Sequence, residues 1–228
     1  MHPLSGFRSE RRTSPRLLGL AVSIAIVLQG CALRPDVAAD SDAPEPRRAM
    51  PATSHPPASY DEALRTWHTP EDLNRWIGER FAYDVARAMR LSESQREMRG
   101  TLPIHAPAQF YARPEGVCVD LARFAVETLQ VVAPEAKARY VMLEFAPVTI
   151  QGNLLRRHWV VSFERDGMLY FFADAKRPGT IAGPYASTQA FVDDYSEVRH
   201  RPITAFRELP SYQRRAKVQA VRTPRADV

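Results

Sequence analysis

The hydrophobic pattern of this chain changes its period near Pro134, and this change constrains the fold most. Before it, apolar residues recur at spacings of three and four, as on one face of a helix. After it, residues 140–148, 157–164 and 168–173 are rich in β-branched and aromatic side chains with a period of two, which predicts three strands. Helices followed by consecutive strands predict an α+β fold, with N-terminal helices packed on an antiparallel sheet.

Two amphipathic helices are predicted outside the segment that carries Cys118. The first covers about residues 69–91, where Thr69 is a favoured N-cap and Pro70 suits the first helical position. The second covers residues 187–198, after the strands. Residues 92–113 contain two prolines and are expected to be looser.

Cys118 lies in the first turn of a predicted helix over residues 118–132, after a loop broken by Pro114 and Gly116. Unpaired N–H groups and the helix dipole stabilise negative charge at a helix N-terminus. This position therefore predicts a lowered thiol pKa and a reactive thiolate. Free cysteines are also common in apolar cores, and the helix alone leaves that alternative open.

His158 and Asp174 flank a predicted hairpin. Residues 165–167 contain the favoured turn pair Asp-Gly between the second and third predicted strands. His158 is expected at the start of one strand and Asp174 at the end of the next. Asp166 lies midway between them in the sequence, so the two side chains are predicted to be neighbours across the ladder.

Cysteine, histidine and aspartate suit cysteine-dependent acyl transfer. A thiolate attacks the carbonyl, an imidazole shares its proton, and a carboxylate orients the imidazole. We therefore predict Cys118 as nucleophile, His158 as general base and acid, and Asp174 as its orienting partner. No cofactor is predicted, and no metal, because the single available thiol and the scattered histidines lack ligand spacing.

Three sequence blocks carry a family resemblance: Gly116–Ala122, His158–Val161 and Phe172–Ala175. Together they resemble the transglutaminase-like superfamily of papain-like cysteine enzymes, which includes bacterial transglutaminase-like cysteine peptidases. The resemblance spans about residues 67–185. It implies a papain-like core with a Cys-His-Asp triad, on a helix, a strand and the following strand, at the three positions already named.

Three further residues are candidates for accessory roles. Asp120 stands two residues after Cys118, where bacterial peptidase-like members of this superfamily often carry an acid, and is expected to cap the helix or bind a loop. Gln109 and Tyr111 lie just upstream and are candidates for completing an oxyanion hole beside the Cys118 amide.

The first 30 residues resemble a bacterial lipoprotein signal peptide. Four arginines precede an apolar run over residues 17–28, and Leu28-Gln29-Gly30-Cys31 resembles a lipobox, although a small residue is more usual than Gln29. The resemblance implies cleavage before Cys31 and lipidation of its sulfur, with Ala32 favouring the outer membrane facing the periplasm. An uncleaved anchor and a plain secretory signal are the alternatives.

Lipidation of Cys31 would leave Cys118 as the single thiol of the mature chain. In an oxidising periplasm an unpaired thiol is prone to wrong pairing and over-oxidation, so its presence favours a functional role.

Four segments are expected along the chain. They are a signal peptide (1–30), a Pro/Ala-rich tether (31–59), a transglutaminase-like domain (60–209) and a basic tail (210–228). The net charge is +5, but the first 30 residues hold four Arg and one Glu, which leaves +2 for the rest. This charge does not indicate a nucleic-acid partner.

The sequence thus predicts a membrane-anchored cysteine hydrolase, a peptidase or amidase with a protein or peptide substrate. Hydrolysis of the thioester is favoured over transfer to an amine because water needs no second site. The alternatives are a protein-glutamine acyltransferase (transglutaminase) and a non-catalytic scaffold or binding lipoprotein of the cell envelope with the same fold.

Overall fold

The computed structural model describes residues 41–45, 55–100 and 102–213. The predicted signal peptide, Cys31 and the basic tail beyond residue 213 lie outside the described residues, as does most of the predicted tether. Among the helices that are described, none combines the length and the apolar character needed to cross a membrane.

The fold is α+β, as predicted, around a five-stranded antiparallel sheet with the order β6-β5-β4-β3-β7. β4 is the central strand and carries buried residues along most of its length, because it is covered on both faces. In chain order the strands are β3 (Arg139–Ile150), β4 (Asn153–Arg165), β5 (Met168–Phe172), β6 (Ala182–Tyr185) and β7 (Ile203–Leu209).

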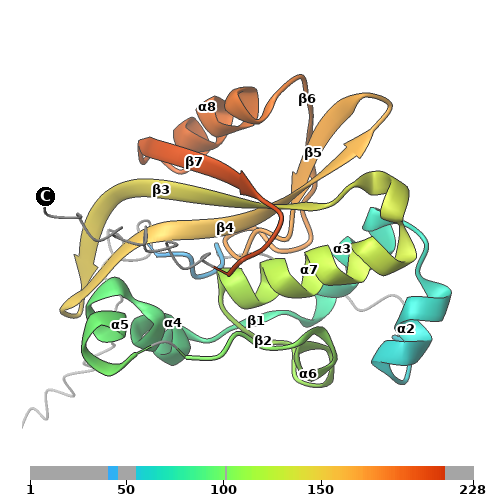
Figure 1. Ribbon diagram of the computed structural model, residues 1–228, viewed down its shortest axis with the longest axis horizontal. Coiled ribbons are helices and arrows are strands. Elements are labelled where there is room, and N and C mark those ends of the chain that lie inside the picture. Colours follow the sequence, from blue (N-terminus) through green and yellow to red (C-terminus); the bar gives the residue numbers. More distant parts are fainter. Residues whose placement is uncertain (1–40, 46–54, 101, 214–228) are drawn as a thin grey trace, which may run out of the picture. The chain divides into compact units, whose positions relative to one another are not determined.

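Helices lie on both faces of this sheet (Figure 1). α8 (Thr188–Val198) packs Phe191 and Tyr195 into an apolar cluster with β3, β4 and β5. α7 (Cys118–Val132) lies on the opposite face and buries its own stripe, including Leu121 and Phe124, in a second and larger cluster. The predictions of helices over residues 118–132 and 187–198 are therefore confirmed to within one residue, with Ser187 as the N-cap of α8.

Five shorter helices and a 3-10 turn complete the α7 side. α2, α3 and α6 pack on α7, whereas α5 packs on β4. α2, α3 and α6 contribute side chains to an aromatic cluster in which Trp76 stacks on Tyr111 at 4.9 Å. These elements are α2 (Tyr60–Thr66), α3 (Pro70–Arg80), α4 (Val85–Leu91), α5 (Glu93–Arg99), α6 (Pro107–Ala112) and η1 (Pro134–Ala136).

The single helix predicted over residues 69–91 is interrupted at residues 81–84 and forms two helices. α3 begins with the predicted Thr69 cap but ends at Arg80. The next residues form β1 (Ala82–Tyr83), which pairs in parallel with β2 (Glu115–Gly116). The side chain of Asp84 then caps α4. Helical periodicity cannot reveal this break, because the hydrogen bonds that stabilise it go to a segment far away in the sequence.

The predicted loop over residues 149–155 is also wrong. β3 and β4 are longer than predicted, and their ladder continues to the pair Ile150 and Asn153. A two-residue turn, Gln151-Gly152, joins them, and both residues have positive φ angles, of 50° and 77°. The sequence pattern predicts neither β6 nor β7. These are the two edge strands, and β7 carries no buried residue.

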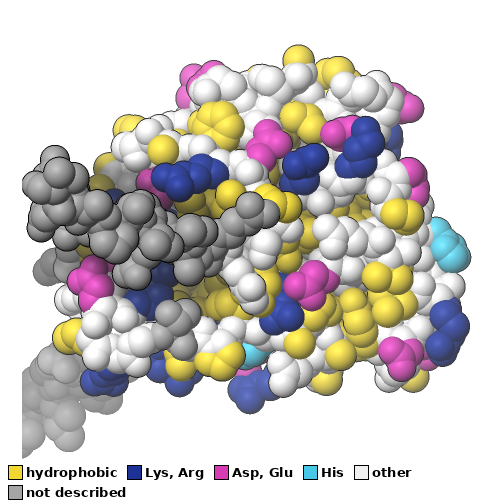
Figure 2. All heavy atoms as spheres, in the orientation of Figure 1, with side chains coloured by type: hydrophobic (Ala, Val, Ile, Leu, Met, Phe, Trp, Pro, Cys, Tyr) yellow, Lys and Arg dark blue, Asp and Glu magenta, His cyan; other side chains and the backbone are white. Residues whose placement is uncertain are grey.

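The face shown in Figure 2 carries interspersed side chains of both charges. Apolar side chains gather below the centre, over the part of the molecule formed by α7 and its neighbouring helices. Large apolar side chains that are well exposed are single residues, such as Met98 at 68% and Val131 at 61%. Scattered exposure of this kind is normal for a folded domain.

Candidate active site

Cys118 is the first residue of α7, and Gly116, two residues before it, lies in a tightly packed position. A Cβ atom added at Gly116 would lie 3.0 Å from the side chain of Asp120 and 3.1 Å from that of Phe110. Asp120 Oδ2 accepts the backbone N–H of Val117 at 3.1 Å, which ties the N-cap residue to the first turn of the helix. The helix therefore begins at a defined residue, and the thiol is held at its tip.

Asp120 ties α7 to two further segments. Its fully buried carboxylate accepts two hydrogen bonds from Arg87, at 2.7 and 2.8 Å, and one from the backbone N–H of His105 at 2.9 Å. A carboxylate can be buried only when its charge and its lone pairs are satisfied in this way. Asp120 thus both caps the helix and holds a loop, and it positions the helix that carries Cys118.

The structure brings His158 and Asp174 together. His158 Nε2 lies 2.8 Å from Asp174 Oδ1, and both residues are buried. Asp174 Oδ1 also accepts the backbone N–H of Lys176 at 2.9 Å, which fixes the carboxylate. His158 lies inside β4, opposite Leu143 of β3, and not at the start of the strand as predicted.

The predicted reason for this contact is wrong by one residue of register. In the β4–β5 ladder Arg165 pairs with Met168 and Val161 with Phe172, so the turn is centred between Asp166 and Gly167. That register would place Ala175, not Asp174, opposite His158. β5 ends at Phe172, however, and Ala173 has a left-handed backbone with a φ angle of 55°. This local turn brings the carboxylate of Asp174 to Nε2 of the imidazole.

A second carboxylate, that of Asp42, also reaches the imidazole. Asp42 Oδ1 lies 3.0 Å from His158 Nδ1. The Cys118 thiol is adjacent, since its sulfur, a ring nitrogen of His158 and a carboxylate oxygen of Asp42 all lie within 4.8 Å of one another. Because Nε2 is engaged by Asp174, Nδ1 is the ring nitrogen left for the thiol. The sequence pattern assigns Asp42 to the tether and contains no signal for this contact.

The predicted lowering of the thiol pKa at the helix N-terminus is wrong for this arrangement. Cys118 is 7% exposed, and burial raises the pKa of its thiol above the ordinary value of 9.0. The charge of Asp42 raises it further, whereas the imidazole of His158 and the backbone N–H of Trp159 lower it. With Asp42 in place, the free-energy cost of desolvating the thiolate exceeds the stabilisation that His158 and the Trp159 N–H provide.

His158 and Asp174 each stabilise the charged form of the other. Burial lowers the pKa of His158, but the carboxylates of Asp42 and Asp174 raise it well above 6.5 overall. Burial likewise raises the pKa of Asp174, but hydrogen bonding to His158 and the charges of His158 and Arg199 lower it below 3.8 overall. The site can therefore supply an imidazolium as a proton donor.

Tyr195 of α8 and Arg199, the C-cap of that helix, extend this network, and the sequence pattern identifies neither. The Tyr195 hydroxyl donates to Asp174 Oδ2 at 2.9 Å, and its ring lies at 12° to the His158 ring. Arg199 Nη1 donates to the Tyr195 hydroxyl at 3.1 Å from a fully buried side chain. In the sequence Tyr195 counts only as part of an apolar stripe. An arginine four residues later on the same face is the one signal that points to a polar role.

The predicted accessory residues Gln109 and Tyr111 use their polar atoms within the fold. The Gln109 side-chain oxygen accepts the backbone N–H of Ala106 at 3.2 Å. The Tyr111 hydroxyl donates to the carbonyl of Pro57 at 2.5 Å. A role in an oxyanion hole stays a prediction for both. Burial, and then the charges of Asp42 and Cys118, raise the pKa of the Tyr83 hydroxyl in β1 well above 10.0.

The cluster of Cys118, His158 and Asp42 offers sulfur, nitrogen and oxygen donors of the kinds that zinc accepts. A cation bound there would, however, lie beside the Arg199 guanidinium, whose Nη2 is 3.3 Å from Asp42 Oδ1. The carboxylate is already neutralised by that guanidinium and by the imidazole. The geometry therefore fits ion pairing better than metal binding.

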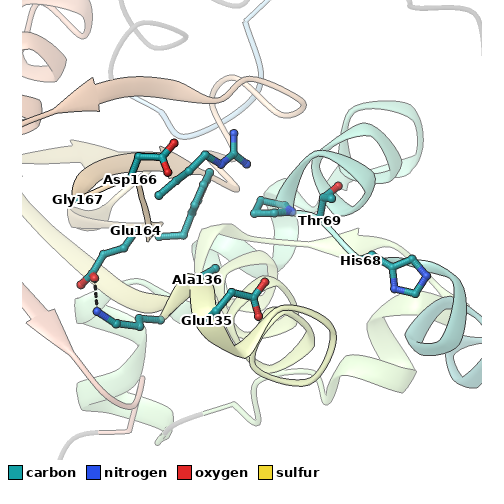
Figure 3. A pocket seen from close by; sticks show the side chains of 11 residues that line it. His68, Thr69, Glu135, Ala136, Glu164, Asp166 and Gly167 are labelled. Atoms are coloured by element: carbon teal, nitrogen blue, oxygen red, sulfur yellow. Dashed lines mark hydrogen bonds and ion pairs between the residues drawn. The ribbon is translucent and has the colours of Figure 1, made fainter.

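A pocket of about 430 Å³ lies apart from these residues (Figure 3). The hairpin turn at Asp166 and Gly167 lies on one of its sides, with η1 and the start of α3 on the others. Two ion pairs lie at this pocket, Lys137 with Glu164 at 2.6 Å and Arg165 with Glu71 at 2.7 Å. It contains neither the thiol nor the imidazole, so the candidate active site is placed at Cys118.

A thiol at a helix tip beside an imidazole–carboxylate pair on an antiparallel sheet is the arrangement that the sequence blocks imply for papain-like enzymes. Comparison with protein families agrees with this class. A family model described as a transglutaminase-like domain matches residues 63–201. The chain belongs to this family. A comparison with curated proteins gave no match.

Proposed function

We propose that this chain is a cysteine hydrolase that cleaves a peptide or amide bond through a thioester on Cys118. The observation that carries the proposal is the position of the thiol beside His158, whose other ring nitrogen is bound by Asp174 at 2.8 Å. A scaffold has no need of a buried imidazole–carboxylate pair at its only described thiol, whereas acyl transfer requires one.

In the proposed reaction the neutral form of the His158 imidazole takes the Cys118 proton at Nδ1, and the thiolate attacks the carbonyl carbon of the substrate. The N–H groups at the start of α7 are placed to stabilise the developing oxyanion. The imidazolium then protonates the leaving amine, and a thioester remains on Cys118. Water loses a proton to His158, attacks the thioester and releases the acid, while Asp174 keeps the imidazole oriented throughout.

The cellular setting is part of the same proposal. A lipid on Cys31 would anchor the chain to the outer membrane, with the domain facing the periplasm and acting on a protein or peptide substrate. The resemblance of residues 1–31 to a lipoprotein signal peptide supports this setting. Globomycin treatment of expressing cells, with Cys31→Ser as a second arm, should change the mass of the processed chain if the lipid is attached.

The test of the chemistry is the rate at which iodoacetamide alkylates Cys118 near pH 7, followed by mass spectrometry of the purified full chain. His158→Ala should slow alkylation by about 100-fold or more, because the thiol loses its proton acceptor. His68→Ala is the matched control, since His68 is exposed and far from the site in the fold, and should leave the rate unchanged. An equal rate in the wild type and in His158→Ala would contradict the proposal and favour the scaffold.

Hydrolysis and transfer can be separated with the same protein. Labelled casein should release small peptides or acid products, and Cys118→Ala should abolish this release. If a primary amine such as cadaverine is incorporated into casein faster than casein is hydrolysed, the chain is an acyltransferase and the hydrolase proposal fails.

A further inference from the structure

Residues 41–45 lie against the candidate active site, although they belong to the predicted tether. In Figure 1 this short blue segment is beside β4. The carbonyl of Ser41 accepts hydrogen bonds from Lys176 Nζ at 3.2 Å and from Arg199 Nη2 at 3.4 Å. The backbone N–H of Glu45 donates to the carbonyl of Lys176 at 3.0 Å. Both ends of the segment are therefore attached to the chain that follows Asp174.

The middle of this segment places a carboxylate at the reacting atoms. Asp42 Oδ1 is 3.0 Å from His158 Nδ1, the ring nitrogen that must accept the thiol proton. A carboxylate oxygen also lies within 4.8 Å of the Cys118 sulfur. A substrate carbonyl has to approach the sulfur to about 3–3.5 Å before it can react. The Asp42 side chain occupies the space that such a carbonyl needs.

The occupant is suited to inhibit and not to react. A carboxylate is an anion and carries no amine leaving group, so attack by the thiolate yields no thioester. Its negative charge also opposes formation of the thiolate next to it. Asp42 in this position resembles the acid product of the proposed hydrolysis more than its substrate.

The site holds this carboxylate through positive charge that is built into the fold. Arg199 Nη2 lies 3.3 Å from Asp42 Oδ1, and the Arg199 side chain is fully buried. Lys176 adds a second cation to the same segment. If residues 41–45 leave the site, this positive charge is left to be matched by another anion or by water, since a buried cation is costly without a partner.

We infer that residues 41–45 inhibit the enzyme in cis by occupying the substrate position, and that a peptide carrying an acidic side chain displaces them. This inference rests on the proposed hydrolase function and names its regulation and the chemistry of its ligand. Arg199 and Lys176 bind either residues 41–45 or the acidic peptide that displaces them. Asp42 is the residue that blocks the site.

The first test compares alkylation of Cys118 by iodoacetamide in the full chain and in Asp42→Ala. Loss of the carboxylate opens the space at the sulfur and lowers the thiol pKa. Each unit by which the pKa falls raises the fraction of thiolate at pH 7 by about tenfold. Asp42→Ala should therefore be alkylated at least tenfold faster at pH 7. Asp61→Ala is the matched control, because Asp61 is an exposed acid at the start of α2, and should react like the wild type.

The second test restores the block in trans. A peptide with the sequence of residues 39–47 should slow alkylation of Asp42→Ala, and the same peptide with alanine at the position of Asp42 should not. Equal rates in the wild type and Asp42→Ala, with circular dichroism spectra that match, would overturn the inference. If both peptides slowed alkylation of Cys118 equally, the Asp42 carboxylate would not be needed for the block, and that part of the inference would be wrong.

The two proposals fail in different ways. The inference is judged by the effect of Asp42→Ala, and the hydrolase function by the effect of adding His158→Ala to that variant. If Asp42→Ala speeds alkylation but the added His158→Ala has no effect, the segment blocks the thiol while the catalytic proposal fails.

Discussion

At Cys118, helix position and burial act on the thiol in opposite directions. The helix N-terminus and His158 favour the thiolate, whereas burial and Asp42 favour the neutral thiol. The result is a thiol whose pKa is raised in the structure described. A position at a helix tip therefore does not establish a reactive cysteine, because the solvent and the neighbouring charges decide the pKa.

The His158–Asp174 pair should stabilise the fold most between about pH 4 and 6.5. The pKa of His158 is raised above 6.5, so its contribution is complete below 6.5 and is lost as the pH rises through the folded-state pKa. The pKa of Asp174 is lowered below 3.8, so its contribution is complete above 3.8 and is lost as the pH falls further. The coupling in a double-mutant cycle of His158→Gln and Asp174→Asn, from urea unfolding at several pH values, measures this. A coupling that stays constant from pH 3 to pH 10 would contradict it.

The residues of the candidate triad could be predicted from the sequence, and their neighbours could not. Asp174 and His158 flank a recognisable turn, so even a register wrong by one residue placed them near each other. Asp42 and Tyr195 come from segments whose approach to the site depends on the folding of the whole chain. Their local sequences are those of a linker and of an ordinary amphipathic helix.

The start of α7 is the element whose structure most directly positions the thiol. Gly116 is tightly packed against Asp120 and Phe110, and Asp120 joins the helix to Arg87 and His105. The sequence predicts the helix and its capping acid, because both are local. It does not predict the partner Arg87, which lies in α4, nor the parallel pairing of β1 with β2 that breaks the predicted helix over residues 69–91.

Asp120→Ala should lower the free energy of unfolding by about 3–5 kcal/mol, because it leaves the buried Arg87 guanidinium without its carboxylate. The measurement is urea unfolding followed by circular dichroism. Asp61→Ala, at an exposed position in a first helical turn, is the control and should change the stability by less than about 0.5 kcal/mol. Similar stability of the Asp120→Ala protein and the control would show that the buried network is not needed for the fold.

The described part of the molecule has two apolar clusters that share the central sheet. Val160 faces the cluster under α8 and Val161 the cluster under α7, so β4 contributes adjacent residues to both. Two clusters on opposite faces of one strand cannot easily unfold separately. We therefore expect one cooperative transition for the domain.

Phe191→Ala tests this at the scale of the whole domain. Phe191 is buried and stacks on Phe171 at 3.8 Å, so its truncation should lower the stability by about 3–5 kcal/mol. The three tryptophans, Trp67, Trp76 and Trp159, all belong to the cluster on the opposite face. Tryptophan fluorescence and far-UV circular dichroism should nevertheless shift by the same amount in urea. A fluorescence midpoint that stays at the wild-type value would show that the two faces unfold independently.

The position of Asp42 beside His158 and Cys118 has a consequence for how such an enzyme would respond to its surroundings. An inhibitor that is part of the same chain has an effective concentration set by the intervening residues, typically in the millimolar range, and dilution of the protein does not change it. A free ligand that binds equally well would have to reach a similar concentration to compete. Dilution of the purified protein would therefore not activate it, and activity would report the local abundance of the competing ligand.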